Sequence, residues 1–574
     1  MPISGETRTQ ATQQATSTNQ RFADLTSIGW LSLIDPVNDT IIGTMGNDTL
    51  SAQAEGDIVF GLAGDDDLSS AFNRTALIGG RGHDTLRTEV IVPLTGTEPV
   101  RGLAIQIGGA GNDALDATVT LQGGDVSLQF REVSAEVLVD GGGGNDTINA
   151  VANVILALIG NVTATTRVLG GRGNDIINAV ADTRGAVASS NFAMNSVDGG
   201  SGDDHIRAQA RTEFQGIAAT AINVLNGGDG NDVLDASAVG TSILTDLVSN
   251  SLHGGRGDDV LRAFNRTGSN MSAPVGINEL CGGDGNDVLE ATHSSSQNLI
   301  TDVTNRLDGG KGDDSLTAVS TASGPSVLAL NHLDGGKGDD RLTADITADC
   351  IRVQALNHLE GADGQDALTA RLDVGPESFL TSYDVLNVLN GGSGNDHLEA
   401  FLSVVSRPDV TGTFPAENRL DGGSGNDHLT VFGGSGNVLN GGDGNDILVG
   451  GIGNDDFVGE GGADRFVFAP QSGLDTVDFQ QGLDIIDLTA LAATIGSFAD
   501  LDIDVIGQDS VINFDADDHL TVVGVTSLSE SDFLFALGGP ASLVKWREGD
   551  RLLPNDFAAD AVAFPAACFL SFPQ

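Results

Sequence analysis

Aspartates that close short glycine-rich turns are the side chains of this sequence whose type and spacing most clearly indicate chemistry. Glycine permits positive φ, so such a turn can be tight and can direct several backbone carbonyls at one point. The closing Asp adds a hard carboxylate oxygen, and Ca²⁺ prefers six to eight oxygen ligands. The hexapeptide G-G-x-G-[N/D/H]-D begins at Gly79, Gly108, Gly141, Gly170, Gly199, Gly227, Gly254, Gly282, Gly309, Gly335, Gly391, Gly422, Gly441 and Gly450. Looser copies are Gly43-Thr-Met-Gly-Asn-Asp48, Gly61-Leu-Ala-Gly-Asp-Asp66 and Gly361-Ala-Asp-Gly-Gln-Asp366.

A glycine-rich turn has two other interpretations. A single copy could be a flexible acidic loop, but that interpretation fails for so many copies in one register. A phosphate-binding loop needs a Lys followed by Ser or Thr after its last Gly. Asp stands at that place here, where it would repel phosphate. One turn offers too few oxygens for a full calcium shell, so we expect each ion to lie between the turns of two stacked coils.

The spacing of the turns predicts the elements that position them. Near both ends the units repeat every nine residues, and between about Gly108 and Gly422 the interval widens to 26–33 residues. Each wide unit has room for two strands of roughly eight residues and two turns. The flanks alternate with period two and contain β-branched residues, which disfavours helices. We therefore expect an all-β fold, a parallel β-roll or β-solenoid with calcium-binding glycine-rich turns.

The repeat resembles a known family. The segment Gly441-Gly-Asp-Gly-Asn-Asp-Ile-Leu-Val449 matches the calcium-binding nonapeptide of RTX proteins, G-G-x-G-x-D-x-U-x, at every position. The wide spacing departs from the tandem pattern of that family. By this resemblance the expected cofactor is Ca²⁺ in several copies, and the expected carboxylate ligands are Asp48, Asp66, Asp84, Asp113, Asp146, Asp175, Asp204, Asp232, Asp259, Asp287, Asp314, Asp340, Asp366, Asp396, Asp427, Asp446, Asp455 and Asp464.

The sequence changes character after Gly461. Gly461-Gly-Ala-Asp-Arg-Phe-Val-Phe468, Asp475-Thr-Val-Asp478, Gly482-Leu-Asp-Ile-Ile-Asp487 and Ser531-Asp-Phe-Leu-Phe535 follow in order. This order resembles the C-terminal cap of serralysin-type metalloproteases and similar type I secretion substrates. The resemblance implies a β-sandwich-like cap that carries an uncleaved export signal. Residues 539–574 extend beyond the point where that family usually stops.

Composition narrows the class of partner and the location. The formal net charge of −53 excludes nucleic acid, because phosphate contacts need clustered Lys and Arg. No apolar run is long enough to cross a bilayer. The segment Met1–Gln20 is polar and lacks the apolar core of a cleaved signal peptide, so we expect export by a type I apparatus and an extracellular location, at or near the cell surface.

The sequence contains no recognisable enzymatic motif. None of the nine histidines opens an H-E-x-x-H zinc motif, and the Gly-Ser-Gly triplets do not complete G-x-S-x-G. The repeats begin by Gly43, which leaves no room ahead of them for a catalytic domain in this sequence. The favoured function is a secreted, calcium-dependent structural, surface or adhesive protein, with a surface or matrix polysaccharide or protein left open as partner. The alternative is a polysaccharide-acting enzyme on a β-solenoid.

The flanks of the turns also predict the interior. An Asn stands two residues before the apolar residue that leads into ten of the turns, and on a strand residues two apart share a face. We expect these Asn side chains to point inward, opposite Ala, and to stack as a hydrogen-bonded ladder. The alternative is a cap on each turn from the surface. The series is Asn195, Asn223, Asn250, Asn278, Asn305, Asn331, Asn357, Asn387, Asn418 and Asn437.

These patterns divide the chain into six segments. We expect a disordered polar segment at the N-terminus, two tandem nonapeptide β-rolls around a long-coil solenoid, and then the cap and an atypical tail. The boundaries are 1–36, 37–92 and 93–440, followed by 441–468, 469–538 and 539–574.

Overall fold

The computed structural model describes most of the chain between Ser27 and Ala536. The described residues are 27–34, 37–94, 98–123, 131–156, 160–185, 190–214, 218–242, 245–268, 274–295, 301–375, 382–404, 416–434, 436–515 and 518–536. The expected tail, 539–574, lies outside them, as do residues 1–26 of the expected N-terminal segment.

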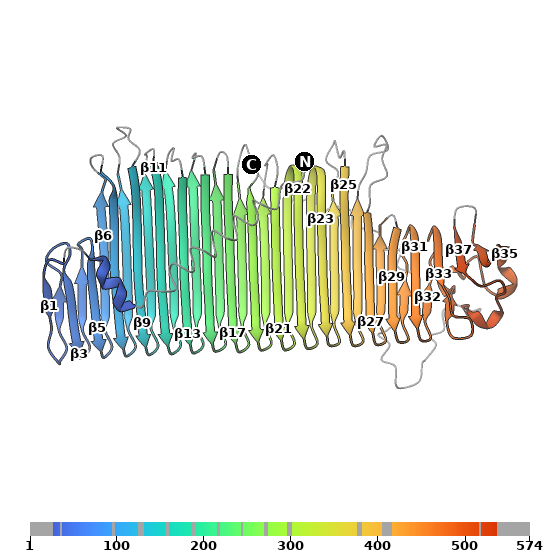
Figure 1. The fold of residues 1–574 in the computed structure, drawn as a ribbon, viewed down its shortest axis with the longest axis horizontal. Coiled ribbons are helices and arrows are strands. Elements are labelled where there is room, and N and C mark those ends of the chain that lie inside the picture. Colours follow the sequence, from blue (N-terminus) through green and yellow to red (C-terminus); the bar gives the residue numbers. More distant parts are fainter. Residues whose placement is uncertain are drawn as a thin grey trace.

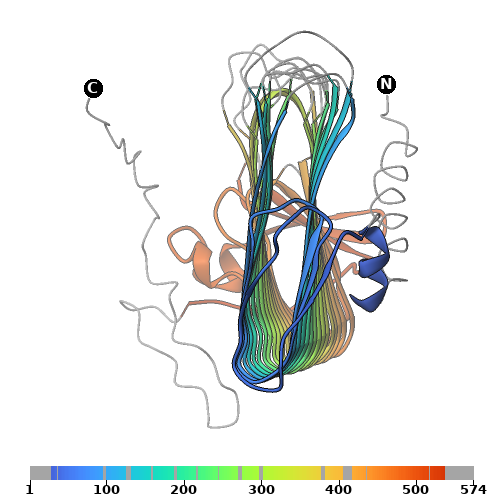
Figure 2. The same cartoon turned by 90° about the vertical axis from the view of Figure 1, so that its left-hand side faces the viewer.

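The described chain winds into a parallel β-solenoid whose strands form two facing ladders (Figures 1 and 2). The predicted fold class is confirmed. Every coil contributes one strand to each ladder, and neighbouring coils pair in parallel along the whole axis. In Figure 1 the glycine-rich turns form the lower edge of the solenoid.

The first ladder holds the strands that lead into the glycine-rich turns. Its members are β1 (Thr40–Ile42), β3 (Ile58–Ala63), β5 (Thr75–Arg81), β7 (Val100–Ala110), β9 (Arg131–Gly143), β11 (Gly160–Arg172), β13 (Ser190–Ser201), β15 (Ala218–Asp229), β17 (Thr245–Arg256), β19 (Val275–Asp284), β21 (Thr301–Lys311), the second halves of β22 (Ser315–Lys337) and β23 (Arg341–Asp363), β25 (Ser382–Ser393), β27 (Ala416–Ser424), β29 (Gly436–Asp443), β31 (Asn454–Gly461) and β33 (Leu474–Asp478).

The second ladder holds the strands that follow those turns. Its members are β2 (Thr49–Ser51), β4 (Asp67–Ser70), β6 (Thr85–Pro93), β8 (Ala114–Gln122), β10 (Thr147–Leu156), β12 (Ile176–Gly185), β14 (His205–Phe214), β16 (Val233–Thr241), β18 (Val260–Thr267), β20 (Val288–Ser295), the first halves of β22 and β23, β24 (Ala367–Val374), β26 (His397–Val404), β28 (His428–Gly433), β30 (Ile447–Val449), β32 (Arg465–Val467) and β34 (Ile485–Asp487).

Side chains alternate between the interior and solvent along each strand, as period-two patterning requires. On β16, Leu234, Ala236 and Ala238 are buried, whereas the intervening Asp235 and Ser237 face outward. The same inward Leu or Ile followed by Ala recurs from coil to coil in the second ladder. The core is thus a stack of thin layers rather than one compact cluster.

The predicted Asn ladder is confirmed. All ten Asn side chains are at most 1% exposed. Each amide nitrogen from Asn195 to Asn418 donates to Oδ1 of the next Asn in the series, at 2.8–3.0 Å. The amide of Asn357 also donates to the carbonyl of Arg371 in the facing ladder at 2.9 Å. The Asn stack therefore holds the coils together and also ties the two ladders to each other.

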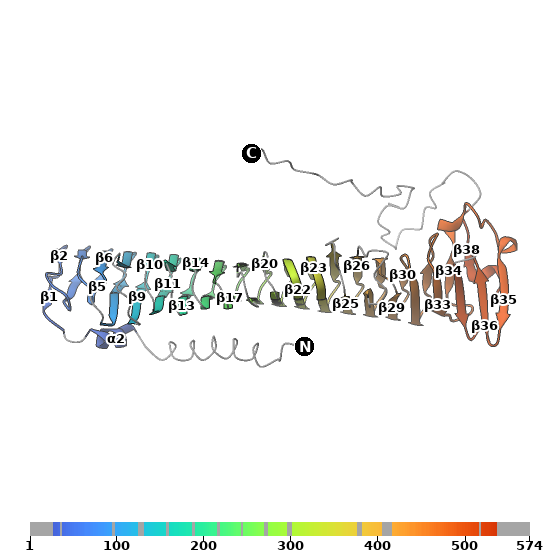
Figure 3. The ribbon, with the colours of Figure 1, turned by 90° about the horizontal axis from the view of Figure 1, so that it is seen from above.

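The solenoid ends in a small antiparallel sheet (red in Figures 1 and 3). β35 (Asp502–Ile506) pairs with β36 (Asp509–Asn513), which pairs with β37 (His519–Val523). β37 joins β33 in parallel, and β38 (Phe533–Leu534) joins β34. The short helices of the cap are η2 (Thr489–Leu491), η3 (Phe498–Asp500) and η4 (Glu530–Asp532).

The expectation of disorder over residues 1–36 is wrong for residues 27–34. Helix α2 (Ser27–Trp30) and η1 (Leu31–Leu33) pack on the outer face of the first ladder beside β9 (Figures 2 and 3). Trp30 is buried there against Ile105 and Leu138, and the guanidinium of Arg167 lies 5.5 Å from its ring centroid. Outward-facing apolar residues on the first coils provide this docking surface.

Candidate metal centre

The glycine-rich turns stack in register along one side of the solenoid, which we call the glycine edge. Turns 18 residues apart at the ends and 26–33 residues apart in the middle reach the same edge, because each complete coil returns the chain to it. The turn Gly227–Asp232, between β15 and β16, illustrates the geometry of the repeat. Its neighbours on the edge are the turns that end in Asp204 and Asp259.

One carboxylate oxygen of each closing Asp is used to hold the stack together. Asp232 Oδ1 accepts a hydrogen bond from the backbone N–H of Asp204 at 2.8 Å. The backbone N–H of Asp232 in turn donates to Asp259 Oδ1 at 2.7 Å. This relation runs unbroken from Asp48 to Asp464 and on to Asp484.

The other carboxylate oxygen is buried and has no hydrogen-bond partner. This holds for Oδ2 in sixteen aspartates of the edge, namely Asp66, Asp84, Asp113, Asp146, Asp175, Asp204, Asp232, Asp259, Asp287, Asp314, Asp340, Asp366, Asp396, Asp427, Asp446 and Asp464. A buried polar atom without a partner is costly, and an isolated buried charge is more so. A row of such oxygens indicates a ligand for each of them.

The glycines of the turn make room for that ligand. A Cβ on Gly227, the first Gly, would overlap Asp232 Oδ2 and lie 2.7 Å from the carbonyl oxygen of Gly254 in the next turn. Two oxygens from adjacent coils therefore border the space that the missing side chain leaves. A Cβ on Gly228 (φ +118°) or Gly230 (φ +140°) would overlap a carbonyl of the preceding turn, so only glycine allows the turns to stack this closely.

Burial raises the pKa of these carboxyl groups. The pKa reaches about 6 for Asp232 and about 7 for Asp259, chiefly because burial disfavours the charged form, and neighbouring aspartates add to the rise at Asp259. The pKa is also raised to about 6 or 7 in Asp113, Asp146, Asp175, Asp204, Asp287, Asp314, Asp340, Asp366, Asp396, Asp427, Asp446 and Asp464. A divalent cation beside Oδ2 would reverse this effect, because it favours the ionised carboxylate.

The donor set fits calcium. Carboxylate and carbonyl oxygens are the ligands of a hard cation. Within the described ranges, no three His, Cys, Asp or Glu side chains gather as a metal cluster. Each turn supplies one carboxylate, so most of the shell would come from backbone carbonyls of two successive turns. That composition suits Ca²⁺ and does not suit a metal that prefers nitrogen or sulfur ligands.

Comparison with known proteins agrees with this chemistry. The model of the RTX calcium-binding nonapeptide repeat (4 copies) matches residues 36–68, 138–150, 194–210, 218–238, 249–265, 301–318, 331–352, 387–401 and 432–466. This chain carries RTX calcium-binding repeats. RTX nonapeptide repeats bind calcium, so the chain binds several Ca²⁺ ions. Proteins with RTX repeats are typically secreted, and the repeats indicate a secreted calcium-binding protein.

Other comparisons say little about the role of this chain. No curated protein matches its sequence. Among solved structures it is similar to the extracellular lipase LipA from Serratia marcescens, with 16% identity and a TM-score of 0.17. The match covers 41% of this chain, and the chain spans 40% of the length of the lipase. Of the helices that the structure describes, none has the length and apolar character of a membrane span.

Of the eighteen predicted ligand aspartates, seventeen lie on the glycine edge, and Asp455 does not. Asp455 follows a nine-residue repeat, which is half a coil, so its turn lies on the opposite edge of the solenoid. Both of its oxygens already accept hydrogen bonds, from Asn437 Nδ2 and from Gly451 N–H. Asp48, in the first turn, is on the glycine edge, but its Oδ2 accepts from Thr44.

Two aspartates that continue the stacks were not predicted as ligands. Asp484 Oδ1 accepts the N–H of Asp464 on the glycine edge, but its Oδ2 already accepts the N–H of Gln480. Asp475 Oδ1 accepts the N–H of Asp455 on the opposite edge. Asp475 Oδ2 is buried without a partner, and burial raises the pKa of this group to about 7. Neither turn has the full G-G-x-G, but both keep a positive-φ Gly two residues before the Asp, at Gly482 and Gly473. This remaining G-x-D pattern is the sequence signal that could have identified the two turns as continuations of the stacks.

Proposed function

We propose that this protein is an extracellular structural or adhesive component that is exported unfolded by a type I apparatus and folds when calcium fills the glycine edge. The observation that carries the proposal is the row of sixteen buried Oδ2 atoms without partners. Without cations these carboxyl groups oppose the fold, because their burial disfavours the ionised state that prevails at neutral pH. With cations the same groups become ligands.

Charge balance supports a folding switch. The formal net charge of the chain is −53. If about 17 divalent ions bind, the charge becomes −53 + 34, or about −19, which removes most of the self-repulsion that opposes compaction. Extracellular calcium modules bind with Kd values of roughly 0.1–1 mM, so such sites would be empty in the cytosol and filled outside.

The folding step is tested by calcium titration of the full chain after chelation. Circular dichroism should show little strand in excess chelator and a cooperative gain as calcium is added. Mg²⁺ at the same concentration is the matched control, because it demands a stricter octahedral shell and releases its water reluctantly. Unchanged strand content in excess chelator would falsify the folding step.

Export is tested by deletion. The cap-like sequence after Gly461 and the polar segment Met1–Gln20 motivate the design. Removing Met1–Gln20 should leave secretion intact, whereas removing Asp464 to the C-terminus should abolish it when a type I apparatus is co-expressed. The reverse pattern would rule out the type I route without affecting the calcium-folding step.

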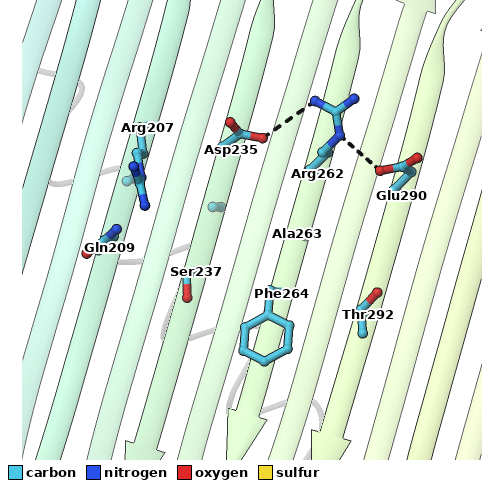
Figure 4. A pocket seen from close by; sticks show the side chains of 11 residues that line it. Arg207, Gln209, Asp235, Ser237, Arg262, Ala263, Phe264, Glu290 and Thr292 are labelled. Atoms are coloured by element: carbon cyan, nitrogen blue, oxygen red, sulfur yellow. Dashed lines mark hydrogen bonds and ion pairs between the residues drawn. The ribbon is translucent and has the colours of Figure 1, made fainter.

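The alternative, a polysaccharide-acting enzyme, would need a groove with free carboxyl groups away from the calcium turns. A hollow of about 580 Å³ does lie on the outer face of β14, β16, β18 and β20 (Figure 4). The carboxylates of this hollow, Asp235 and Glu290, both form ion pairs with Arg262, at 3.8 Å and 2.9 Å. This ion-paired row favours a recognition surface for a polar polymer over an acid–base pair. Binding without cleavage of acidic and neutral polysaccharides is the expected result, and turnover would support the enzyme.

A further inference from the structure

Two histidines from successive coils meet on the outer face of the first ladder, three residues before the first glycines of their turns, Gly335 and Gly361. His332 on β22 and His358 on β23 are partners in the parallel register. Their ring centroids lie 4.8 Å apart, and their Nδ1 atoms are 3.0 Å apart. Two nitrogen ligands of one tetrahedral Zn²⁺ ion, each at about 2.0–2.1 Å, are separated by roughly 3.3–3.4 Å. The two Nδ1 atoms lie at hydrogen-bond distance, a few tenths of an ångström closer than such a chelating pair.

The tautomer of His358 is suited to metal binding. His358 Nε2 lies 3.2 Å from Glu360 Oε1. A carboxylate at that distance accepts the Nε2 proton, which leaves the lone pair of the neutral ring on Nδ1, facing His332. Histidine ligands of metals usually donate their other ring N–H to a carboxylate in this way, and the carboxylate orients the ring.

The surroundings favour a cation. Asp334 and Glu360 lie two residues after the histidines on the same strands, and hence on the same face, with Asp308 beside Asp334. The nearest cation in the row, Arg306, is held by Glu279 at 3.0 Å on its far side. Both rings are half-buried and so are accessible from solvent.

We propose that His332 and His358 form a binding site for a divalent transition metal ion of the Zn²⁺ class, distinct from the calcium turns. Imidazole nitrogen is a poor ligand for Ca²⁺ and a good one for Zn²⁺, Ni²⁺ and Cu²⁺, so the two kinds of site would not compete for one ion. The two imidazoles would supply two ligands, and water would complete the shell. The histidines are 26 residues apart in the sequence, so only the stacked coils bring them together.

A second histidine pair provides an internal control. His397 and His428 are also register partners, with ring centroids 4.9 Å apart. Nε2 of His397 contacts Glu399 Oε1 at 3.2 Å, as in the first pair, whereas Nε2 of His428 contacts Thr430 Oγ1 at 3.4 Å. This pair has the same residue types and a similar ring spacing, but its two rings make no nitrogen-to-nitrogen contact like that of His332 and His358, so it should not provide the tight site.

The test is Zn²⁺ binding to the full chain in excess calcium, measured by calorimetry, with Co²⁺ absorption as a report on nitrogen coordination. The wild-type chain should bind one Zn²⁺ ion more tightly than its acidic background does. His332→Gln and His358→Gln should each remove that site and the Co²⁺ signal. Glu360→Gln should weaken binding by about 10- to 100-fold, as loss of an orienting carboxylate does.

The double variant His397→Gln/His428→Gln should keep the tight site. Loss of the site in that variant, unchanged binding in His332→Gln, or wild-type binding no tighter than the acidic background would each overturn the proposal. Circular dichroism in calcium checks that every variant is folded. Because all measurements are made in excess calcium, their outcome does not depend on whether calcium drives folding.

Discussion

The side-chain amide of Asn278 donates a hydrogen bond to Asn305 Oδ1 at 2.9 Å across 27 residues of sequence. Both side chains are fully buried. The second N–H of Asn278 reaches the carbonyl of Thr292 in the facing ladder at 3.3 Å. One amide therefore joins two coils and two ladders, in a core that is otherwise made of aliphatic layers.

Asn278→Ala should destabilise the calcium-loaded protein by about 2 kcal/mol, because it leaves the buried side-chain oxygen of Asn305 without its donor, while the amide of Asn250 keeps two other acceptors. Asn226→Ala is the matched control, since that amide lies on the exposed face and bonds Asp198. Its effect should stay within about 0.5 kcal/mol. Denaturant unfolding in excess calcium measures the free energy of unfolding of the two variants. Equal losses would contradict a stabilising role for the Asn ladder.

Asp232→Asn should have opposite effects with and without calcium. Asn keeps an oxygen for the N–H of Asp204 but removes a charge that burial disfavours, since the pKa of Asp232 is raised to about 6. With calcium, the variant should bind fewer ions and need more calcium to fold. In chelator, it should retain more strand than wild type. The control is Asp235→Asn on the outer face, which should leave the calcium stoichiometry unchanged, as measured by equilibrium dialysis.

Chelated protein should gain structure as pH falls. The folded-state pKa of Asp146 is about 7 and that of Asp175 about 6, whereas an unfolded Asp titrates near 3.9. The metal-free fold binds more protons than the unfolded chain, so these groups contribute stability that is present below about pH 4 and is lost as pH rises toward 7. Strand content in chelator should therefore be higher at pH 5 than at pH 8. In limiting calcium the order should reverse, since protons compete with Ca²⁺ for the carboxylates.

His293 should make the folded protein sensitive to acid. This ring is fully buried between Asn265 and Ser320 of the adjacent coils, and burial lowers its pKa to about 3. Its neutral form is favoured in the fold, so its contribution is complete above pH 6.5 and is lost as pH falls through that value toward 3. At pH 5 the loss is about 2 kcal/mol.

His293→Leu should remove that part of the pH dependence. Ile346 and Leu372 occupy the same interior row in later coils, so an aliphatic side chain is accommodated there. The measurement is the difference in unfolding free energy between variant and wild type at pH 5 and pH 7.5, in saturating calcium. A difference that does not change with pH would show that His293 is already protonated or hydrated in the fold.

The repetitive part of the fold was predictable because each coil repeats the same two constraints, an inward aliphatic residue and a turn that only glycine allows. Asp455 shows the limit of that reasoning. Its turn matches the repeat at every position, but the edge that a turn reaches depends on how many half-coils precede it, and nine-residue and longer intervals are mixed in this chain. Trp30 shows another limit, since its docking surface consists of outer-face residues such as Ile105 and Leu138 that come together only after the coils stack.

Ala362→Gly should stabilise the protein by about 1 kcal/mol. Ala362 occupies the second glycine position of its turn with φ +80°, a conformation that costs a residue with a Cβ roughly 1–2 kcal/mol. Gly in the same place would remove that strain, offset in part by greater freedom of the unfolded chain. Thermal unfolding in calcium measures the effect. Gly392→Ala in the next coil, where a Cβ would overlap the carbonyl of Ala362, should have the opposite sign.

The glycine-rich turns of the long units keep one length while the interval between them varies from 26 to 33 residues, and the glycine edge advances by one strand per unit. The number of units therefore sets the length of the solenoid, and the residue count of each unit does not. Each added unit lengthens the molecule by one strand spacing, about 4.8 Å, whatever its own residue count. The chain therefore works as a molecular ruler, in which duplication or loss of whole units would alter reach in fixed steps and leave the surface of every remaining coil unchanged.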